Sequence, residues 1–310
     1  MKHFALVLAA LLWATPSFAG RMLVSHLDAD YHASFEPGPY TYDPTAAQDF
    51  IRTSISWVRN GSLKPFLFVE SSIIPPFVEK LPNGQINGNK AFHADGEIGL
   101  KNSGFAAGVD YVRADAARLV SELQNLGAYS AIVVASDFGG ILTGAELEQL
   151  RLQKNLIASF VANGGGIYAM AQSNDGIGRF NPATGEADPE ATAPGFLAAG
   201  HGLLGNETPY GFLPIPVTSK SNYGLFLKNS TLTPFGASLG FTAGMLDGNE
   251  APLYFDPSPG WTPISYDSTG RISNMAAIYT GNNPPSVPEP ETYLLAGTVL
   301  VALGLYRRLK

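Results

Sequence analysis

Two histidines and two aspartates occupy every second position near the start of the chain: His26, Asp28, Asp30 and His32. If the strand predicted just before them continued this far, all four side chains would lie on one face of it. Imidazole with carboxylate suits zinc or manganese, and carboxylates alone suit calcium. A solvated strand end or loop accounts for the same residues without a metal. We favour that interpretation, so we expect neither a metal nor another cofactor.

A second group of polar side chains follows the ends of three predicted parallel strands. It comprises Asp28, Ser136, Asp137, Gln172, Ser173 and Asn174. Ligands of open parallel sheets bind outside the carboxyl ends of the strands. Short hydrogen-bonding side chains at such a place suit a polar neutral or cationic ligand, for instance a sugar. Strand ends also run into polar loops without any ligand, and this simpler explanation stays open beside the ligand crevice.

No residue set identifies a catalytic site. Residues 236–240 match the G-x-S-x-G pattern around Ser238, but the last histidine, His201, precedes that serine, so the order required of an α/β-hydrolase fails. We interpret this segment as glycine-rich helix packing or a turn. The kinase tripeptide at 137–139 lacks its companion loops and is attributed to chance. The chain has no cysteine, which excludes disulfides, thiolate metal sites and a cysteine nucleophile.

A strand, a helix and a second strand between residues 128 and 171 form the centre of the predicted fold. The strands are the apolar runs 132–135 and 167–170, expected to be adjacent and parallel. The helix between them begins with a Thr143–Glu146 capping box and a Leu142–Leu147 hydrophobic staple. Glycines from Gly164 end it. Its apolar stripe consists of Leu147, Leu150, Ile157, Phe160 and Val161.

Other elements extend this unit into an α/β domain. Towards the N-terminus we predict a strand at 21–26, a helix from Pro44 to the Asn60-Gly61 pair, a strand at 65–69, an irregular insertion at 71–109 and a helix at 114–126. After Met170 we predict short strands at 212–217 and 223–227, a weak helix at 232–246, and a hairpin of 261–266 with 272–279. The fold class is therefore α/β, a mostly parallel sheet flanked by helices, with an irregular, partly β, C-terminal elaboration.

The central unit resembles the class I glutamine amidotransferase-like superfamily, on the residues Tyr129–Ser136, Leu142–Thr143, Glu146–Leu147, Phe160–Val161 and Gly164–Met170. The resemblance implies a flavodoxin-like three-layer fold. In catalytic members a cysteine follows the second strand, where this chain has Met170, Ala171 and Gln172. The fold is thus expected to carry over and the amidotransferase activity is not.

Both ends of the chain carry targeting patterns. Residues 1–19 hold Lys2, an apolar run, Pro16 and a small-x-small site, typical of a secretory signal peptide. A proline-rich linker covers 282–292, and a hydrophobic helix with a basic end covers 293–310. The 14-residue run 293–306 would rise about 21 Å as a helix, short of a comfortable bilayer crossing. Spacing alone leaves open a short membrane anchor and a docking helix.

The order Val-Pro-Glu-Pro, apolar helix and terminal basic cluster resembles the PEP-CTERM sorting signal of Gram-negative bacteria. The resemblance implies Pro288, Glu289 and Pro290 as the motif, with Arg307 and Arg308 as the stop. In that family an exosortase-type membrane enzyme recognises and removes the tail, and the proteins belong to exopolysaccharide-producing, often biofilm-forming bacteria. It therefore implies an inner-membrane intermediate, with the tail as a transmembrane helix, and then the cell envelope or extracellular matrix.

Composition fits one exported domain at 20–281. The chain has 310 residues, 45% of them hydrophobic, and a formal charge of −7, which becomes −9 without the two end segments. A domain with this net negative charge lacks the basic character that binding to nucleic acid requires. We predict an envelope or matrix protein with a non-catalytic binding or structural role linked to exopolysaccharide, and the exosortase-type enzyme, the inner membrane and exopolysaccharide as partners.

The alternative is an extracytoplasmic hydrolase that acts on polysaccharide or peptide through carboxylates. Two carboxylates about 5 to 10 Å apart in a cleft would favour it.

Overall fold

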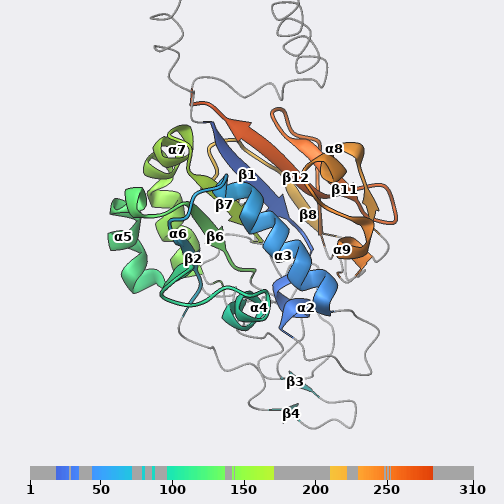
Figure 1. Ribbon diagram of the computed structural model, residues 1–310, viewed down its shortest axis with the longest axis horizontal. Coiled ribbons are helices and arrows are strands. Elements are labelled where there is room, and N and C mark those ends of the chain that lie inside the picture. The colour runs from blue at the N-terminus through green and yellow to red at the C-terminus, as the bar shows by residue number, and fades with distance from the viewer. Residues whose placement is uncertain are drawn as a thin grey trace, which may run out of the picture.

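The fold is built on one sheet of ten strands. The computed structural model describes residues 19–27, 29–34, 44–71, 79–80, 86–87, 96–136, 142, 144–170, 210–221, 230–247, 249, 251 and 253–281. The main path of the sheet runs β5-β2-β6-β7-β1-β12-β10-β8 (Figure 1). The first five strands on this path are parallel to one another. The predicted fold class, a mostly parallel sheet flanked by helices, is confirmed at this level.

The parallel strands are short and buried on both faces. They are β1 (Gly20–Ser25), β2 (Phe66–Val69), β5 (Tyr111–Ala114), β6 (Ala131–Val134) and β7 (Gly166–Ala169). Ile167 of β7 lies in register with Ile132 of β6 on one side and with Met22 of β1 on the other. Such strands can be apolar on both faces because helices cover both. The predicted adjacency of strands 132–135 and 167–170 is confirmed.

Antiparallel strands complete the other half of the sheet. They are β12 (Ile272–Tyr279), β10 (Leu253–Phe255), β8 (Ser219–Ser221), β11 (Thr262–Tyr266) and β9 (Thr231–Leu232). β12 pairs with β1 along its length, so that Gly20 lies opposite Tyr279. The predicted hairpin is confirmed as β11 and β12. Asp267 stabilises its turn by accepting hydrogen bonds from the backbone of Thr269 and Arg271 at 2.8 and 3.0 Å.

Three helices cover one face of the sheet: α2 (Ala29–Ala33), α3 (Pro44–Arg59) and α4 (Gly96–Asn102). In Figure 1, α3 lies across the near face in front of β1 and β7. Its buried stripe includes Ala47, Phe50, Ile51, Ile55 and Val58. As predicted, α3 ends at Asn60 and Gly61, whose φ angles are 50° and 77°.

The opposite face is covered by α5 (Ala116–Gln124), a 3₁₀ turn (Leu126–Ala128), α6 (Gly144–Leu152) and α7 (Lys154–Ala162). The helix predicted as one element is two, separated at Gln153. Leu150, Ile157 and Val161 are buried as predicted. The predicted cap Thr143 lies outside the described residues. Glu146 accepts a hydrogen bond from the backbone N–H of Ala116 at 2.9 Å, so it stabilises the start of α5.

Several segments differ from the prediction. The edge strand β5 was not expected, and the insertion contains α4 and the small ladder of β3 (Glu79–Lys80) with β4 (Ile86–Asn87). The strand predicted at 212–217 is wrong, since this buried segment is irregular. Pro214 and Pro216 deprive it of backbone donors for a ladder.

The weak helix predicted at 232–246 is instead two short helices, α8 (Pro234–Ser238) and α9 (Ala243–Asp247). Gly240, at φ 95°, lies between them.

The predicted terminal segments cannot be compared with the structure. Residues 1–18 and 282–310 lie outside the described residues, as does the strand predicted at 223–227. In the part of the chain that the structure describes, no helix has the length and apolar character needed to cross a membrane.

Candidate functional site

The strand order creates one topological switch point in the parallel part of the sheet. From β2 the chain proceeds to β5 on one side, whereas from β6 it proceeds to β7 on the other. Ligands of open α/β sheets bind at the carboxyl ends of the strands beside such a point. The residues directly after these two ends are Glu70 and Ser71 for β2, and Ala135 and Ser136 for β6.

Asp30 of α2 holds the carboxyl end of β6. Its Oδ2 accepts a hydrogen bond from the backbone N–H of Ser136 at 2.8 Å, and its Oδ1 accepts one from the Ser136 hydroxyl at 2.9 Å. Asp30 and Ser136 are both fully buried, at 1% and 0% exposed. A buried carboxylate is tolerated where charge-assisted hydrogen bonds satisfy it. This pair therefore fixes the helix after β1 against the end of β6.

Glu70 likewise fixes the start of a helix, α4, against the end of β2. Its two carboxylate oxygens accept hydrogen bonds from the backbone N–H groups of Gly96 and Glu97, at 2.7 and 3.2 Å, where α4 begins. Its Oε2 also lies 3.2 Å from the Arg113 guanidinium of β5. Glu70 is completely buried, so the positive helix end and Arg113 together compensate its charge.

Glu97 extends this network toward solvent. It accepts a hydrogen bond from the Tyr111 hydroxyl at 2.8 Å and lies 3.3 Å from Arg113 and 3.1 Å from Lys101. Burial acts to raise the pKa of Glu97, but the Tyr111 hydrogen bond and the charges of Lys101 and Arg113 outweigh it, so the pKa lies below its ordinary value. With a side chain 17% exposed, Glu97 is the solvent-facing carboxylate of this group.

Tyr168 of β7 lies buried near the Asp30 carboxylate. Burial raises the pKa of Tyr168 well above its ordinary value, and the negative charge of Asp30 raises it further. The phenol therefore remains protonated at neutral pH and is not a base. The switch point thus offers fixed hydrogen-bonding groups, held by Asp30 and Glu70, rather than a free acid and base.

The four metal candidates do not share a strand face. β1 ends at Ser25, and Asp30 and His32 lie on α2, so the predicted continuation of the strand is wrong. The ring of His26 stacks on Phe255 at 3.8 Å, within the core on the opposite face from the α2 alanines. Asp28 is not described. Among the described residues no three His, Asp or Glu side chains are placed to hold a metal ion.

Only one residue of the predicted ligand crevice can be placed. Ser136 lies at the carboxyl end of β6, as predicted, while Asp28, Asp137, Gln172, Ser173 and Asn174 lie outside the described residues. Glu70, Arg113 and Glu97 were not predicted from the sequence, because the strand β5 that carries Arg113 was not expected. An Arg on a short strand, between two acidic residues that are distant in sequence, gives no local signal.

The G-x-S-x-G segment has the structure expected of glycine-rich packing. Ser238 is on the short helix α8, and its hydroxyl donates a hydrogen bond to the carbonyl oxygen of Phe235 at 2.6 Å. A Cβ atom on Gly236 would lie 2.5 Å from the carbonyl oxygen of Ile264. The glycine permits this close approach of helix and strand, so the interpretation as packing is confirmed.

Known proteins give no independent indication of what this arrangement does. When the chain is compared with models of protein families, with characterised proteins and with solved structures, none of the three comparisons yields a match.

Proposed function

We propose that this protein is exported, sorted to the cell envelope or extracellular matrix through a PEP-CTERM tail, and acts there as a binding or structural module. The observation that carries the binding role is the switch point between β2 and β6, whose carboxylates already bind backbone amides and Arg113. The ligand class is a polar neutral or cationic molecule, with exopolysaccharide as the expected partner.

The finer fold assignment is part of this proposal. The flavodoxin-like strand order is 2-1-3-4-5. The order β5-β2-β6-β7-β1 has the same form when β2 is counted as the first strand and β1 as the fifth. Helices on both faces further support a flavodoxin-like three-layer domain. The chain also resembles glutamine amidotransferase-like proteins in this respect, but without a cysteine after β7 it lacks their nucleophile.

We favour binding over hydrolysis by paired carboxylates. A general acid needs a raised pKa and a general base needs a free lone pair aimed at substrate. The pKa of Glu97 is lowered rather than raised, and Asp30 and Glu70 are buried acceptors of backbone hydrogen bonds. Asp30 and Glu70 are suited to holding structure, and the solvent-facing Glu97 can accept a hydrogen bond from a ligand.

The binding role is tested with exopolysaccharide purified from the host. Titration calorimetry should detect binding to the wild-type protein, and Glu97→Gln should weaken it about five- to tenfold, as expected when a neutral hydrogen bond replaces a charge-assisted one. Glu148→Gln is the matched control, because Glu148 is a surface carboxylate on α6, also paired with an arginine. Equal affinities for the two variants would contradict the proposed site.

The sorting role rests on the tail. Pro288 and Pro290 keep Glu289 out of a helix or a central strand, and Arg307, Arg308 and Lys310 favour a cytoplasmic location for the end of the apolar run. Intact-mass measurement of protein recovered from the host envelope should show a species that lacks the residues from Tyr293 onward. Protein that still ends at Lys310, in cells that carry the processing enzyme, would mean that the tail is a permanent anchor.

A further inference from the structure

A serine and a histidine far apart in sequence form a close pair at the carboxyl edge of the sheet. His26 directly follows β1, and Ser219 begins the edge strand β8. The Nε2 atom of His26 lies 2.9 Å from the Ser219 hydroxyl oxygen. A serine nucleophile and its general base are recognised by this contact.

Tyr210 determines which ring nitrogen of His26 carries the hydrogen. The Tyr210 hydroxyl donates its one proton to the carbonyl oxygen of Ser25 at 2.8 Å and lies 3.4 Å from Nδ1 of His26. Because the hydroxyl proton is already used, Nδ1 must be the donor in this contact. In the neutral ring Nε2 then has a free lone pair, which accepts the hydrogen bond of Ser219.

Burial keeps the His26 ring neutral and fixed. His26 is 0% exposed, and its ring stacks on Phe255 at 3.8 Å and meets Tyr210 edge-on at 5.4 Å. Burial lowers the pKa of His26 well below 6.5. The base is therefore unprotonated at neutral pH, and its orientation does not depend on a mobile side chain. Ser219, in contrast, is only partly buried, so a substrate can reach it.

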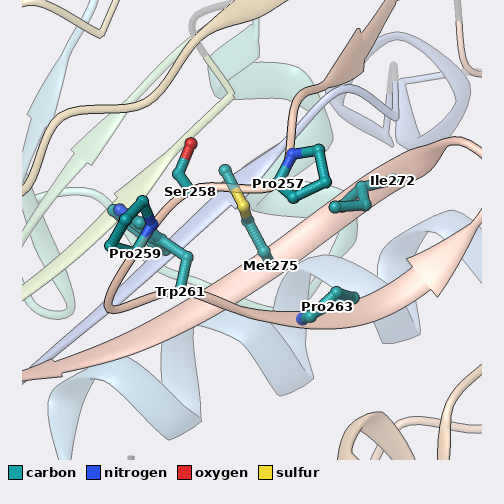
Figure 2. A pocket seen from close by; sticks show the side chains of 7 residues that line it. All are labelled: Pro257, Ser258, Pro259, Trp261, Pro263, Ile272 and Met275. Atoms are coloured by element: carbon teal, nitrogen blue, oxygen red, sulfur yellow. The ribbon is translucent and has the colours of Figure 1, made fainter. Parts of the chain in front are cut away.

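An apolar pocket lies two strands away on the same face of the sheet. Its volume is about 290 Å³, near the lower end of ligand pockets. Phe255 is in register with Ser219 on one side and with Ile272, which lines the pocket, on the other. The distance across two strands is about 10 Å. Figure 2 shows the Met275 side chain extending from β12 toward Ser258 and Pro257, with Trp261 and Pro259 beside them.

We propose that Ser219 is a nucleophile with His26 as its general base, and that this pair hydrolyses carboxylic esters whose apolar acyl chain is long enough to reach the Trp261–Met275 pocket. The Ser219 proton moves to Nε2 of His26 as the serine oxygen bonds to the ester carbonyl carbon. The bond from that carbon to the alkoxy oxygen then breaks, and the leaving alcohol takes the proton from Nε2. Water, activated by the same nitrogen, releases the acid and restores Ser219.

This activity goes beyond the proposed binding role and does not depend on it. The switch point lies between β2 and β6, whereas Ser219 lies at the opposite end of the sheet on β8. Loss of exopolysaccharide binding in Glu97→Gln would therefore leave the proposed serine chemistry unaffected.

An alkyl fluorophosphonate tests the nucleophile in the purified full-length protein. We expect one phosphonyl group on Ser219, found by intact mass and peptide mapping, and none on Ser219→Ala. His26→Gln should slow the labelling at least about 100-fold. Ser238→Ala is the matched control and should be labelled at the wild-type rate. Absence of an adduct on the folded wild type, or an adduct that persists in Ser219→Ala, would overturn the proposal.

A thiol variant tests the base without altering His26. Because the chain has no cysteine, Ser219→Cys introduces a single thiol. At pH 7 its alkylation by iodoacetamide should be at least about tenfold faster than that of Ser238→Cys, an exposed thiol with a pKa expected near 8.5, because neutral His26 can take the thiol proton as the carbon–sulfur bond forms. Tyr210 is the other titratable side chain found in contact with His26 among the described residues. Equal alkylation rates in the two variants would show that His26 does not activate position 219.

Substitution in the pocket tests the acyl group. Ser258→Phe places a ring among the lining side chains. The ratio of kcat/KM for p-nitrophenyl decanoate to that for p-nitrophenyl acetate should fall about tenfold, the effect of losing one or two buried methylenes. An unchanged ratio would refute the assignment of this pocket to the acyl group.

Discussion

Asp30→Ala should cause a large loss of stability at the switch point. The carboxylate accepts two hydrogen bonds from Ser136, at 2.8 and 2.9 Å, and both residues are buried. Hydrogen bonds to charged groups contribute about 1.5–3 kcal/mol each. The free energy of unfolding should therefore fall by about 3–6 kcal/mol, which corresponds to a Tm lowered by about 6–24 °C in a domain of this size.

Urea unfolding followed by circular dichroism measures this loss, and a second substitution identifies its cause. Ser136→Ala removes the hydroxyl bond but keeps the backbone one, so it should cost about half as much as Asp30→Ala. In the double variant the serine substitution should add almost nothing, because its hydroxyl has already lost its partner. Additive costs for the two substitutions, or a loss below about 1 kcal/mol for Asp30→Ala, would refute the reasoning.

Three other predictions concern packing, pH and covalent chemistry. Gly166→Ala should prevent stable folding, since its Cβ would lie 2.2 Å from the carbonyl oxygen of Val58. A Cβ on Gly127 would have nothing within 4 Å, so Gly127→Ala should change the free energy of unfolding by less than about 1 kcal/mol. Both effects are measured by urea unfolding. Because the folded state lowers the pKa of His26, the contribution of this residue to stability is complete above pH 6.5 and falls below pH 6.5 by up to about 1.4 kcal/mol per pH unit. The urea midpoint of His26→Gln should therefore decrease less steeply below pH 6.5 than that of the wild type. Equal pH dependence of the two midpoints would contradict this cause. The protein should show no glutaminase activity, and thiol reagents should leave it unmodified, because it contains no cysteine. Glutamine hydrolysis that iodoacetamide abolishes would contradict the expected absence of a thiol-dependent activity.

The sequence predicts best those elements whose side chains follow a local period. The buried stripe of α3 and the apolar runs of β6 and β7 are such cases, because burial on one helix face or on both strand faces leaves a direct pattern in the residues. β5 escaped prediction because Arg113 interrupts its four residues, which therefore lack the continuous apolar run of β6 and β7.

The error at residues 26–32 has a different origin. Alternating polar residues fit an extended strand, yet Ala29 to Ala33 forms a helix whose alanines pack against α3 and α4. Packing against α3 and α4 favours the helix over an extended strand here, and the spacing of four side chains does not reveal that packing.

The candidate sites depend on contacts between distant parts of the chain. Asp30 and Ser136 are 106 residues apart, and His26 and Ser219 are 193 apart. Their residue types were visible in the sequence, and three of the four, His26, Asp30 and Ser136, were selected as candidates, though not as partners of one another. Their partners follow only from the strand order, which places β1 beside β7 and β12 rather than beside β2.

The pairing of β1 with β12 has a consequence for how an exported chain would fold. β1 lies between β7 and β12, so both of its neighbours are made later, and Gly20 finds its partner Tyr279 only when nearly the whole domain has emerged. A chain that crosses a membrane from its N-terminus could therefore not complete the central sheet during transit. Late pairing of β1 with β12 delays folding, so the chain stays unfolded enough to cross the membrane until its last strand has passed through.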